Sequence, residues 1–280
     1  SAAEKVSLTF DGTSIAGGIS ITNAVNSGMA AIDLNNVNSL DLNIEGNVSL
    51  TGANNAAAIS VGNGKTLSIQ GGGSLNVKAG ARDSVGIGVT DGECGTINFN
   101  GGNITIDGNG YVGVGKLENT SGTGNVNVNG GSVEILGGDI DAEYPIQGVT
   151  LKVAQYGTCD FIAHSANTNN GSLILEGGPL LRGHLANIET SGDEVELSIT
   201  KDGEDVPVKT ITVPQNERGF MTNLPDAGTY LISGTYGERE CGYVGTLNGT
   251  ETGEFEVSDE NVNIYTNIRH TFLPVFWDSE

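Results

Sequence analysis

The sequence predicts an all-β chain in which a right-handed parallel β-helix over residues 1–177 precedes an antiparallel β-sandwich over residues 178–280. Three observations predict this architecture. Short alternating strands recur at a nearly constant spacing in the first half, and a glycine-rich turn follows the first strand of each repeat. The second half instead contains separate period-2 segments, and five of the six prolines lie after residue 170.

Four segments of the first half align with one another at spacings of 27, 30 and 29 residues. Each opens with a short strand in which apolar and polar residues alternate. These strands start at Ser39, Thr66, Thr96 and Asn125. A glycine-rich turn follows each one, as at residues 71–73, and a second alternating strand and a smaller third strand complete the repeat. Glycine in the turn allows the positive φ that a sharp corner requires.

Three strands per repeat trace one turn of a coil, which cannot bury its apolar residues alone. Stacked turns pair strand on strand at about 4.8 Å and enclose a continuous interior. Equivalent apolar residues then form columns, and one predicted column contains Leu40, Leu67, Ile97 and Val126. The first proline is Pro145, so the preceding ladders lose no backbone donor. The alternatives are an antiparallel meander and a disordered low-complexity segment, and the regular apolar spacing counts against disorder.

The second half contains period-2 segments bounded by turn residues, and about seven such strands over roughly 95 residues are typical of an immunoglobulin-like or prealbumin-like sandwich. The predicted strands cover residues 194–200, 206–213, 219–224, 228–233, 241–247, 253–257 and 261–266. A strongly apolar tail follows at 272–277. We expect this tail either to dock on the sandwich or the open end of the helix, or to form a contact through which the protein oligomerises.

The charge balance restricts the partners. The formal net charge is -22, which does not suit nucleic acid, because phosphate neutralisation needs clustered Lys and Arg. It suits cations or neutral sugars. No apolar stretch is long enough to span a bilayer, so we expect no membrane insertion. Cys94, Cys159 and Cys241 lie far apart without metal-ligand spacing, and we interpret them as ordinary small residues.

The sequence resembles two known families in different parts of the chain. Residues 59–75, ISVGNGKTLSIQGGGSL, resemble a repeat of secreted β-helix proteins of gut and other anaerobic bacteria, as do residues 95–106 and the third strand at 86–88. Such proteins are often labelled carbohydrate-binding and have a fold like that of pectate lyases. The resemblance covers roughly residues 30–150 and implies an extracellular or cell-surface bacterial protein whose partner is a polysaccharide or a host or cell-surface glycan. Residues 219–230 are similar to the L-P-x-G-x-Y stretch of prealbumin-like surface stalk domains, with one extra residue between Pro225 and Gly228.

Sugar binding needs an aromatic platform together with polar hydrogen-bonding groups. Tyr111 follows a Gly-Asn-Gly loop, and Asp83, Asp91 and Asp107 come from the same or neighbouring turns of the coil. We predict that these four residues form one glycan-binding face. The alternative is that Tyr111 covers a corner of the coil.

The best candidate for a metal site is the acidic segment 139–143. Asp139 and Asp141 would point to one side of a strand or turn and offer the hard oxygen ligands that calcium prefers. The segment lacks the glycine spacing of a calcium loop, and a solvated acidic loop is the alternative. Calcium is therefore the one candidate cofactor.

Little in the sequence predicts catalysis. A glycosidase needs two carboxylates that flank a cleft, and a lyase of the pectate-lyase kind needs a base beside calcium-binding carboxylates. In the predicted helix only Arg82, next to Asp83, offers a base beside an acid. We therefore expect a secreted or cell-surface protein that binds glycan, mediates adhesion or acts as a structural spacer without catalysis. The alternatives are a polysaccharide lyase or hydrolase on a β-helix, and a structural component of a phage tail or appendage.

Overall fold

A computed structural model describes residues 4–23, 28–109, 111–118, 120–137, 145–164, 170–176, 180–184, 194–201, 204–214, 219–225, 228–236, 239–242 and 254–257. In these ranges the chain is all-β, and no helix is long and apolar enough to cross a membrane. The chain divides into two units. The first comprises residues 1–161 and 168–176, and the second comprises residues 162–167 and 177–280.

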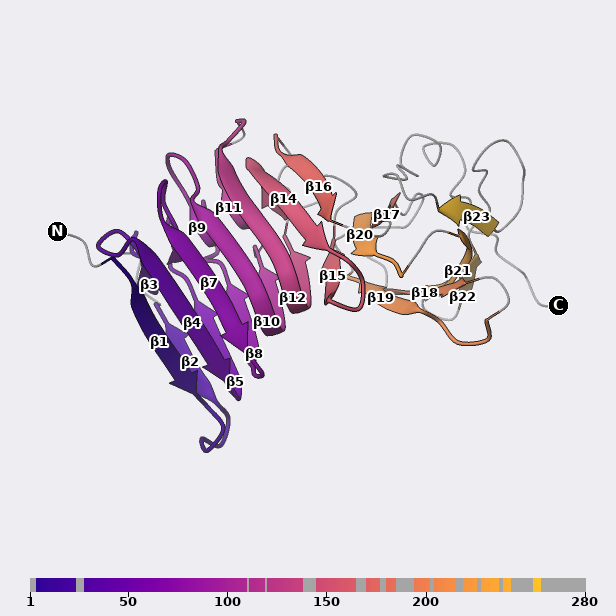
Figure 1. Cartoon of the computed structure of the whole chain (residues 1–280), viewed down its shortest axis with the longest axis horizontal. Coiled ribbons are helices and arrows are strands. Elements are labelled where there is room, and N and C mark those ends of the chain that lie inside the picture. The colour runs from indigo at the N-terminus through magenta and orange to yellow at the C-terminus, as the bar shows by residue number, and fades with distance from the viewer. Residues whose placement is uncertain are drawn as a thin grey trace. The chain divides into compact units, whose positions relative to one another are not determined.

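The first unit is a parallel β-solenoid of about five turns (Figure 1). Each strand pairs in parallel with its counterpart one turn later. The first side contains β1 (Val6–Asp11), β4 (Ser39–Glu45), β7 (Thr66–Gly71), β10 (Thr96–Asp107), β12 (Gly124–Leu136), β14 (Val149–Ala154) and β16 (Ser172–Glu176). The second side contains β2 (Ile19–Thr22), β5 (Asn47–Thr51), β8 (Ser74–Lys78), the later halves of β10 and β12, and β15 (Cys159–Ala163). The third side contains β3 (Ile32–Asp33), β6 (Ala57–Ser60), β9 (Val85–Val89), β11 (Val112–Lys116) and β13 (Ile146–Gln147).

The interior is built from columns of apolar residues. Leu67 lies between Leu40 and Ile97 in neighbouring strands, and Ile97 also lies opposite Val126. Leu67, Ile97 and Val126 are fully buried, and Leu40 is 4% exposed. The predicted column is therefore confirmed, and the parallel coil follows from it. The side chains between these positions along each strand face outward, because residues of a strand alternate between its two faces.

The glycine-rich turns form the corner between the first and second sides. Gly46, Gly71, Gly102 and Gly131 all have positive φ there, as the sequence predicts. At Gly71 φ is 110°, and a Cβ atom would lie 2.2 Å from the carbonyl oxygen of Ile44 in the previous turn. A side chain is therefore excluded at this position by the backbone conformation and by the close approach of successive turns.

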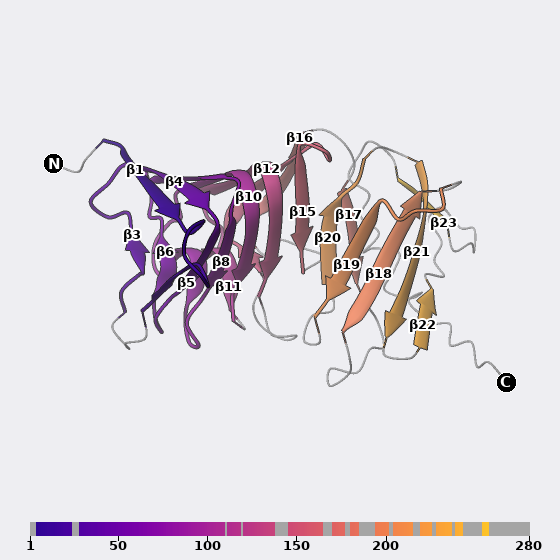
Figure 2. The same ribbon diagram turned by 90° about the horizontal axis from the view of Figure 1, so that it is seen from below.

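The second unit contains antiparallel strands, several of which lie side by side in Figure 2. One sheet contains β18 (Val195–Lys201), β19 (Lys209–Val213), β21 (Gly228–Tyr236), β22 (Arg239–Gly242) and β23 (Glu254–Val257). In addition, β17 (Leu180–His184), which the sequence analysis did not predict, pairs with β20 (Gly219–Asn223). These strands overlap six of the seven predicted segments. The seventh, at 261–266, and the apolar tail at 272–277 lie outside the described residues, and the two-layer sandwich stays a prediction.

Candidate binding surfaces

Three of the four predicted glycan-binding residues lie at one corner of the solenoid, between the second and third sides. Asp107 is the last residue of β10, and Tyr111 immediately precedes β11. Asp83 lies one turn earlier, two residues before β9. Asp91 lies beyond the opposite end of β9, in the loop that leads to β10. The structure thus brings Asp83, Asp107 and Tyr111 to a common corner and places Asp91 at another.

The contacts at this common corner connect successive turns. The carboxylate of Asp107 accepts a hydrogen bond from the backbone N–H of Asn109 at 2.6 Å and forms an ion pair with Lys78 of the previous turn at 3.0 Å. The Asn109 amide also donates to the Gly80 carbonyl of the previous turn at 3.1 Å. Asp107 therefore has a structural role. Asp83 is exposed and Tyr111 is half-buried. The part of Asp83, Asp91, Asp107 and Tyr111 in glycan binding stays a prediction.

The predicted calcium ligands Asp139 and Asp141 lie outside the described residues, and that site stays a prediction. Among the residues that the structure does describe, no group of three or more His, Cys, Asp or Glu side chains is arranged to hold a metal ion.

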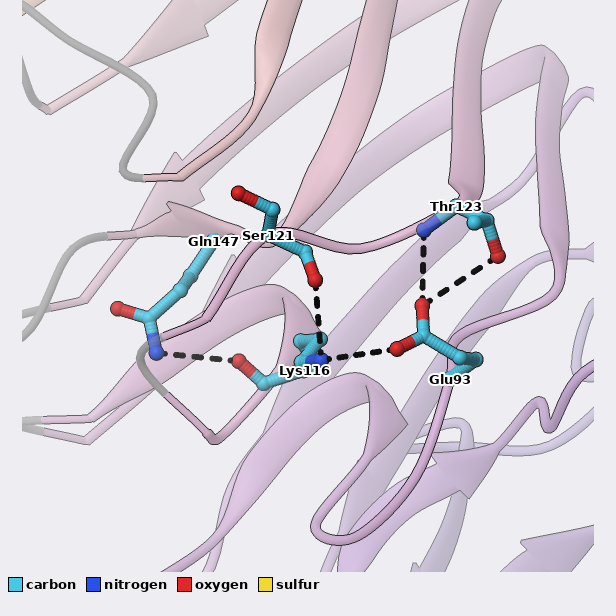
Figure 3. A network of polar contacts seen from close by, with 5 residues as sticks. All are labelled: Glu93, Lys116, Ser121, Thr123 and Gln147. Atoms are coloured by element: carbon cyan, nitrogen blue, oxygen red, sulfur yellow. Dashed lines mark hydrogen bonds and ion pairs between the residues drawn. The ribbon is translucent and has the colours of Figure 1, made fainter.

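A polar cluster around the buried Lys116 lies at the corner between the third side and the next first strand (Figure 3). Lys116, at the end of β11, is 2% exposed, and its Nζ lies 3.1 Å from the Glu93 carboxylate and 3.4 Å from the Ser121 carbonyl oxygen. The other Glu93 oxygen accepts hydrogen bonds from the Thr123 backbone N–H at 2.8 Å and from its hydroxyl at 3.3 Å. The Gln147 amide donates to the Lys116 carbonyl at 3.2 Å. We call these five residues the corner clasp, because they connect three successive turns.

The sequence analysis missed the corner clasp, although a signal was present. Lys116 lies opposite Val89 of the previous turn, so a lysine occupies a ladder position that is apolar one turn earlier. A buried ammonium group requires an anionic partner, and Glu93 supplies it from the preceding loop. Both Glu93 oxygens and the Lys116 Nζ are engaged within the chain, so the clasp is best explained as a structural element.

Cys94 adjoins the corner clasp and is 1% exposed. Its burial raises the pKa of the thiol to about 12. The thiolate is the reactive form of cysteine, so Cys94 is unreactive in the folded protein. This agrees with its interpretation as a small packing residue.

The clasp makes a pH-dependent contribution to stability. The hydrogen bond from the Thr123 backbone, followed by that from Lys116, lowers the pKa of Glu93 below its ordinary value of 4.5. The stabilisation is therefore fully present above that value and is lost as the pH falls through the lower pKa of the folded state. We expect Glu93→Gln to lower the free energy of unfolding at neutral pH, and the difference from the wild type to shrink in acid.

Urea denaturation at about pH 7 and about pH 3 checks this expectation. The control is Glu93→Gln combined with Lys116→Met, in which an apolar side chain of similar length replaces the ammonium group that glutamine leaves without a carboxylate. We expect the double variant to recover stability relative to Glu93→Gln alone. An equal difference between wild type and Glu93→Gln at both pH values would contradict the assigned role.

The outward side of the first sheet carries short amide and hydroxyl side chains in columns. One column contains Ser39, Thr66, Thr96, Asn125, Thr150 and Ser172, with one residue from each of β4, β7, β10, β12, β14 and β16. A second contains Ser68, Asn98 and Asn127, with the charged residues Asp41 and Lys152 at its two ends. We call the surface formed by these two columns the polar ladder face. In each column, successive residues repeat at the strand spacing of about 4.8 Å.

Hydrogen bonds between neighbouring strands orient the side chains of this face. The Asn127 amide donates to the Asn98 side-chain oxygen at 2.7 Å, and the Asn98 amide donates to the Ser68 hydroxyl at 3.3 Å. In the first column, the hydroxyls of Thr150 and Ser172 lie 2.8 Å apart. The face is therefore a regular array of preorganised donors and acceptors. The array was not predicted as a surface from the sequence.

The chain was compared with protein-family models, with curated proteins and with solved structures, and none of the three comparisons gave a match.

Proposed function

We propose that this protein is a non-catalytic extracellular module that binds a neutral polysaccharide along the polar ladder face, with the solenoid acting as its rigid support. The observation that carries the proposal is the array of amide and hydroxyl side chains held in register on the outward side of the first parallel sheet. Amide groups both donate and accept hydrogen bonds, as sugar hydroxyls do. We also propose that the coil is right-handed and that the C-terminal strands form a two-layer sandwich, as the sequence predicts.

Preorganisation and charge support this choice of ligand. The Asn98 and Asn127 side chains are already fixed by their mutual hydrogen bond, so binding would immobilise few additional rotamers, which is a main cost of association. The net charge of -22 disfavours acidic polysaccharides. The extracellular location follows from the resemblance of the repeats to those of secreted bacterial proteins.

Affinity electrophoresis in gels that contain either a neutral β-glucan or polygalacturonate tests the proposal. We expect the neutral polymer to retard the wild type, and the Asn98→Ala, Asn127→Ala double variant to bind about tenfold more weakly, because it lacks two central amides. The matched control is Asn76→Ala with Thr105→Ala, a pair that lies in register on the outward side of the second sheet. This control should bind like the wild type.

Two further measurements test the alternatives, which are a binding site at the common corner and a catalytic function. Tyr111→Ala tests the common corner, and a loss of binding in this variant alone would move the site there. Release of reducing ends or unsaturated uronides from either polymer would identify the chain as a hydrolase or lyase. The proposal is wrong if no neutral polysaccharide from a glycan array is bound, or if the double variant binds as well as the wild type.

A further inference from the structure

Among the residues that the structure describes, apolar side chains of the first turn of the solenoid are partly exposed. Each of β1, β2 and β3 pairs with a strand of the following turn only, so their other edges are open among the described residues. Val6 and Leu8 are 38% and 37% exposed, whereas Leu40 and Leu42, which follow them in the same columns, are 4% and 0% exposed. Figure 1 shows β1 as the outermost strand of its side. Repeat proteins require a cap on such an end, and an open strand edge is a template for pairing.

The sequence of this edge strand is complementary to itself. Residues 5–11 are Lys, Val, Ser, Leu, Thr, Phe and Asp. Read in either direction, the pattern alternates charged or hydroxyl residues with apolar ones, and the two ends carry opposite charges. If the β1 strands of two copies pair antiparallel with their Leu8 residues opposite each other, Val6 of one copy lies opposite Phe10 of the other. The same register sets Lys5 opposite the partner's Asp11.

The orientation of these residues fits that register. Residues that lie directly opposite each other in an antiparallel pair are on the same face of the sheet. Val6, Leu8 and Phe10 belong to the interior side of β1, while Lys5 and Asp11 alternate with them on the outer side. Lys5 already contacts Asp41 at 2.6 Å and is largely exposed. Since an ammonium group has three donors, Lys5 has the capacity to contact Asp41 and the partner's Asp11 together.

We propose that two copies of this chain associate end to end through β1, about a twofold axis perpendicular to the first sheet. The pairing continues the sheet from one copy into the other and covers Val6, Leu8 and Phe10. It places two Lys5–Asp11 ion pairs symmetrically about the axis, as an interface between identical surfaces requires. Both polar ladder faces then lie on the same side of the joined sheet.

Sedimentation velocity of the full chain tests the association over a range of micromolar concentrations at about 0.15 M NaCl, where screening reduces the repulsion between the acidic copies. We expect a species of twice the 28.7 kDa chain mass. Leu8→Arg places two like charges at the axis and should yield monomers. The control is Val206→Arg, at a residue that is 71% exposed in the second unit, and it should remain dimeric.

A mixing experiment distinguishes this register from other dimers and does not depend on Leu8→Arg folding. Lys5→Glu and Asp11→Lys each place like charges opposite each other in a homodimer, so each variant alone should be monomeric or at least about tenfold weaker in association. Mixed together, they restore opposite charges at both positions, and a heterodimer should form. A monomeric wild type, a dimer unaffected by Leu8→Arg, or variants that fail to associate more strongly when mixed would overturn the proposal.

Discussion

Replacement of Gly88 by alanine is expected to destabilise the solenoid by about 3 kcal/mol or more, because overpacking and an unfavourable φ act together. Gly88 lies in β9 with φ at 147°, and a Cβ atom there would lie 1.8 Å from the Gly115 carbonyl oxygen of the next turn. That atom is backbone within a paired strand, so it cannot move without disturbing the pairing of β9 with β11. Thermal and urea unfolding of the variant measure the loss.

Alanine substitutions at two other glycines distinguish the effect of overpacking from the effect of the unfavourable φ. Gly92→Ala keeps a positive φ of 80° but places its Cβ atom in open space, and Gly62→Ala has neither constraint. We expect Gly62→Ala to be close to neutral, Gly92→Ala to be intermediate and Gly88→Ala to be the most destabilising. If Gly88→Ala proves no more destabilising than Gly92→Ala, the close approach of β9 and β11 does not limit this position.

The second large effect is expected at Phe99, where replacement by alanine should lower the free energy of unfolding by about 3–5 kcal/mol, since it opens a cavity in a packed interior. Phe99 is fully buried, and in neighbouring turns it lies opposite Ile69 and Val128. Because Phe99 packs in one column with a residue of the turn before and a residue of the turn after, its removal weakens packing in more than one turn. Denaturant unfolding followed by circular dichroism measures the change.

Phe99→Leu is the matched control, because it keeps an apolar side chain and creates a smaller cavity. We expect it to retain most of the stability that alanine loses. A loss of less than about 1 kcal/mol for Phe99→Ala would show that the interior at this turn is not closely packed.

The parallel coil could be predicted from the sequence because its signals are local and repeated. Leu67 and Ile97 occupy equivalent positions in alternating strands, and the constant spacing of the repeats fixes which residues stack. Gly71 and Gly102 mark corners because a sharp turn with positive φ selects glycine. These features depend on backbone geometry that is the same in every turn, so a single sequence is enough to reveal them.

Side-chain sites depend instead on where in a turn each residue falls. Asp83 and Asp91 are close in sequence, but β9 lies between them, and a strand advances about 3.3 Å per residue. The two therefore lie at different corners. The pairing of Glu93 with Lys116 was missed because it crosses from one turn to the next and involves a charge at a position expected to be apolar. The exposure of Val6 was missed because the repeat pattern shows which residues stack and not how exposed each of them is.

Each turn of the solenoid contacts only the turn before it and the turn after it. The length of the solenoid can therefore change by whole turns. One added copy of the 30-residue turn that begins at Thr66 would insert one strand into each side and lengthen the coil by about 4.8 Å. The turns before and after the insertion would still form parallel strand pairs and stacked apolar columns with their neighbours. Each of the two polar columns would gain one residue, so the number of repeats sets the length of the polar ladder face. If this face binds polysaccharide as we propose, the number of repeats also sets the length of polymer that it can contact.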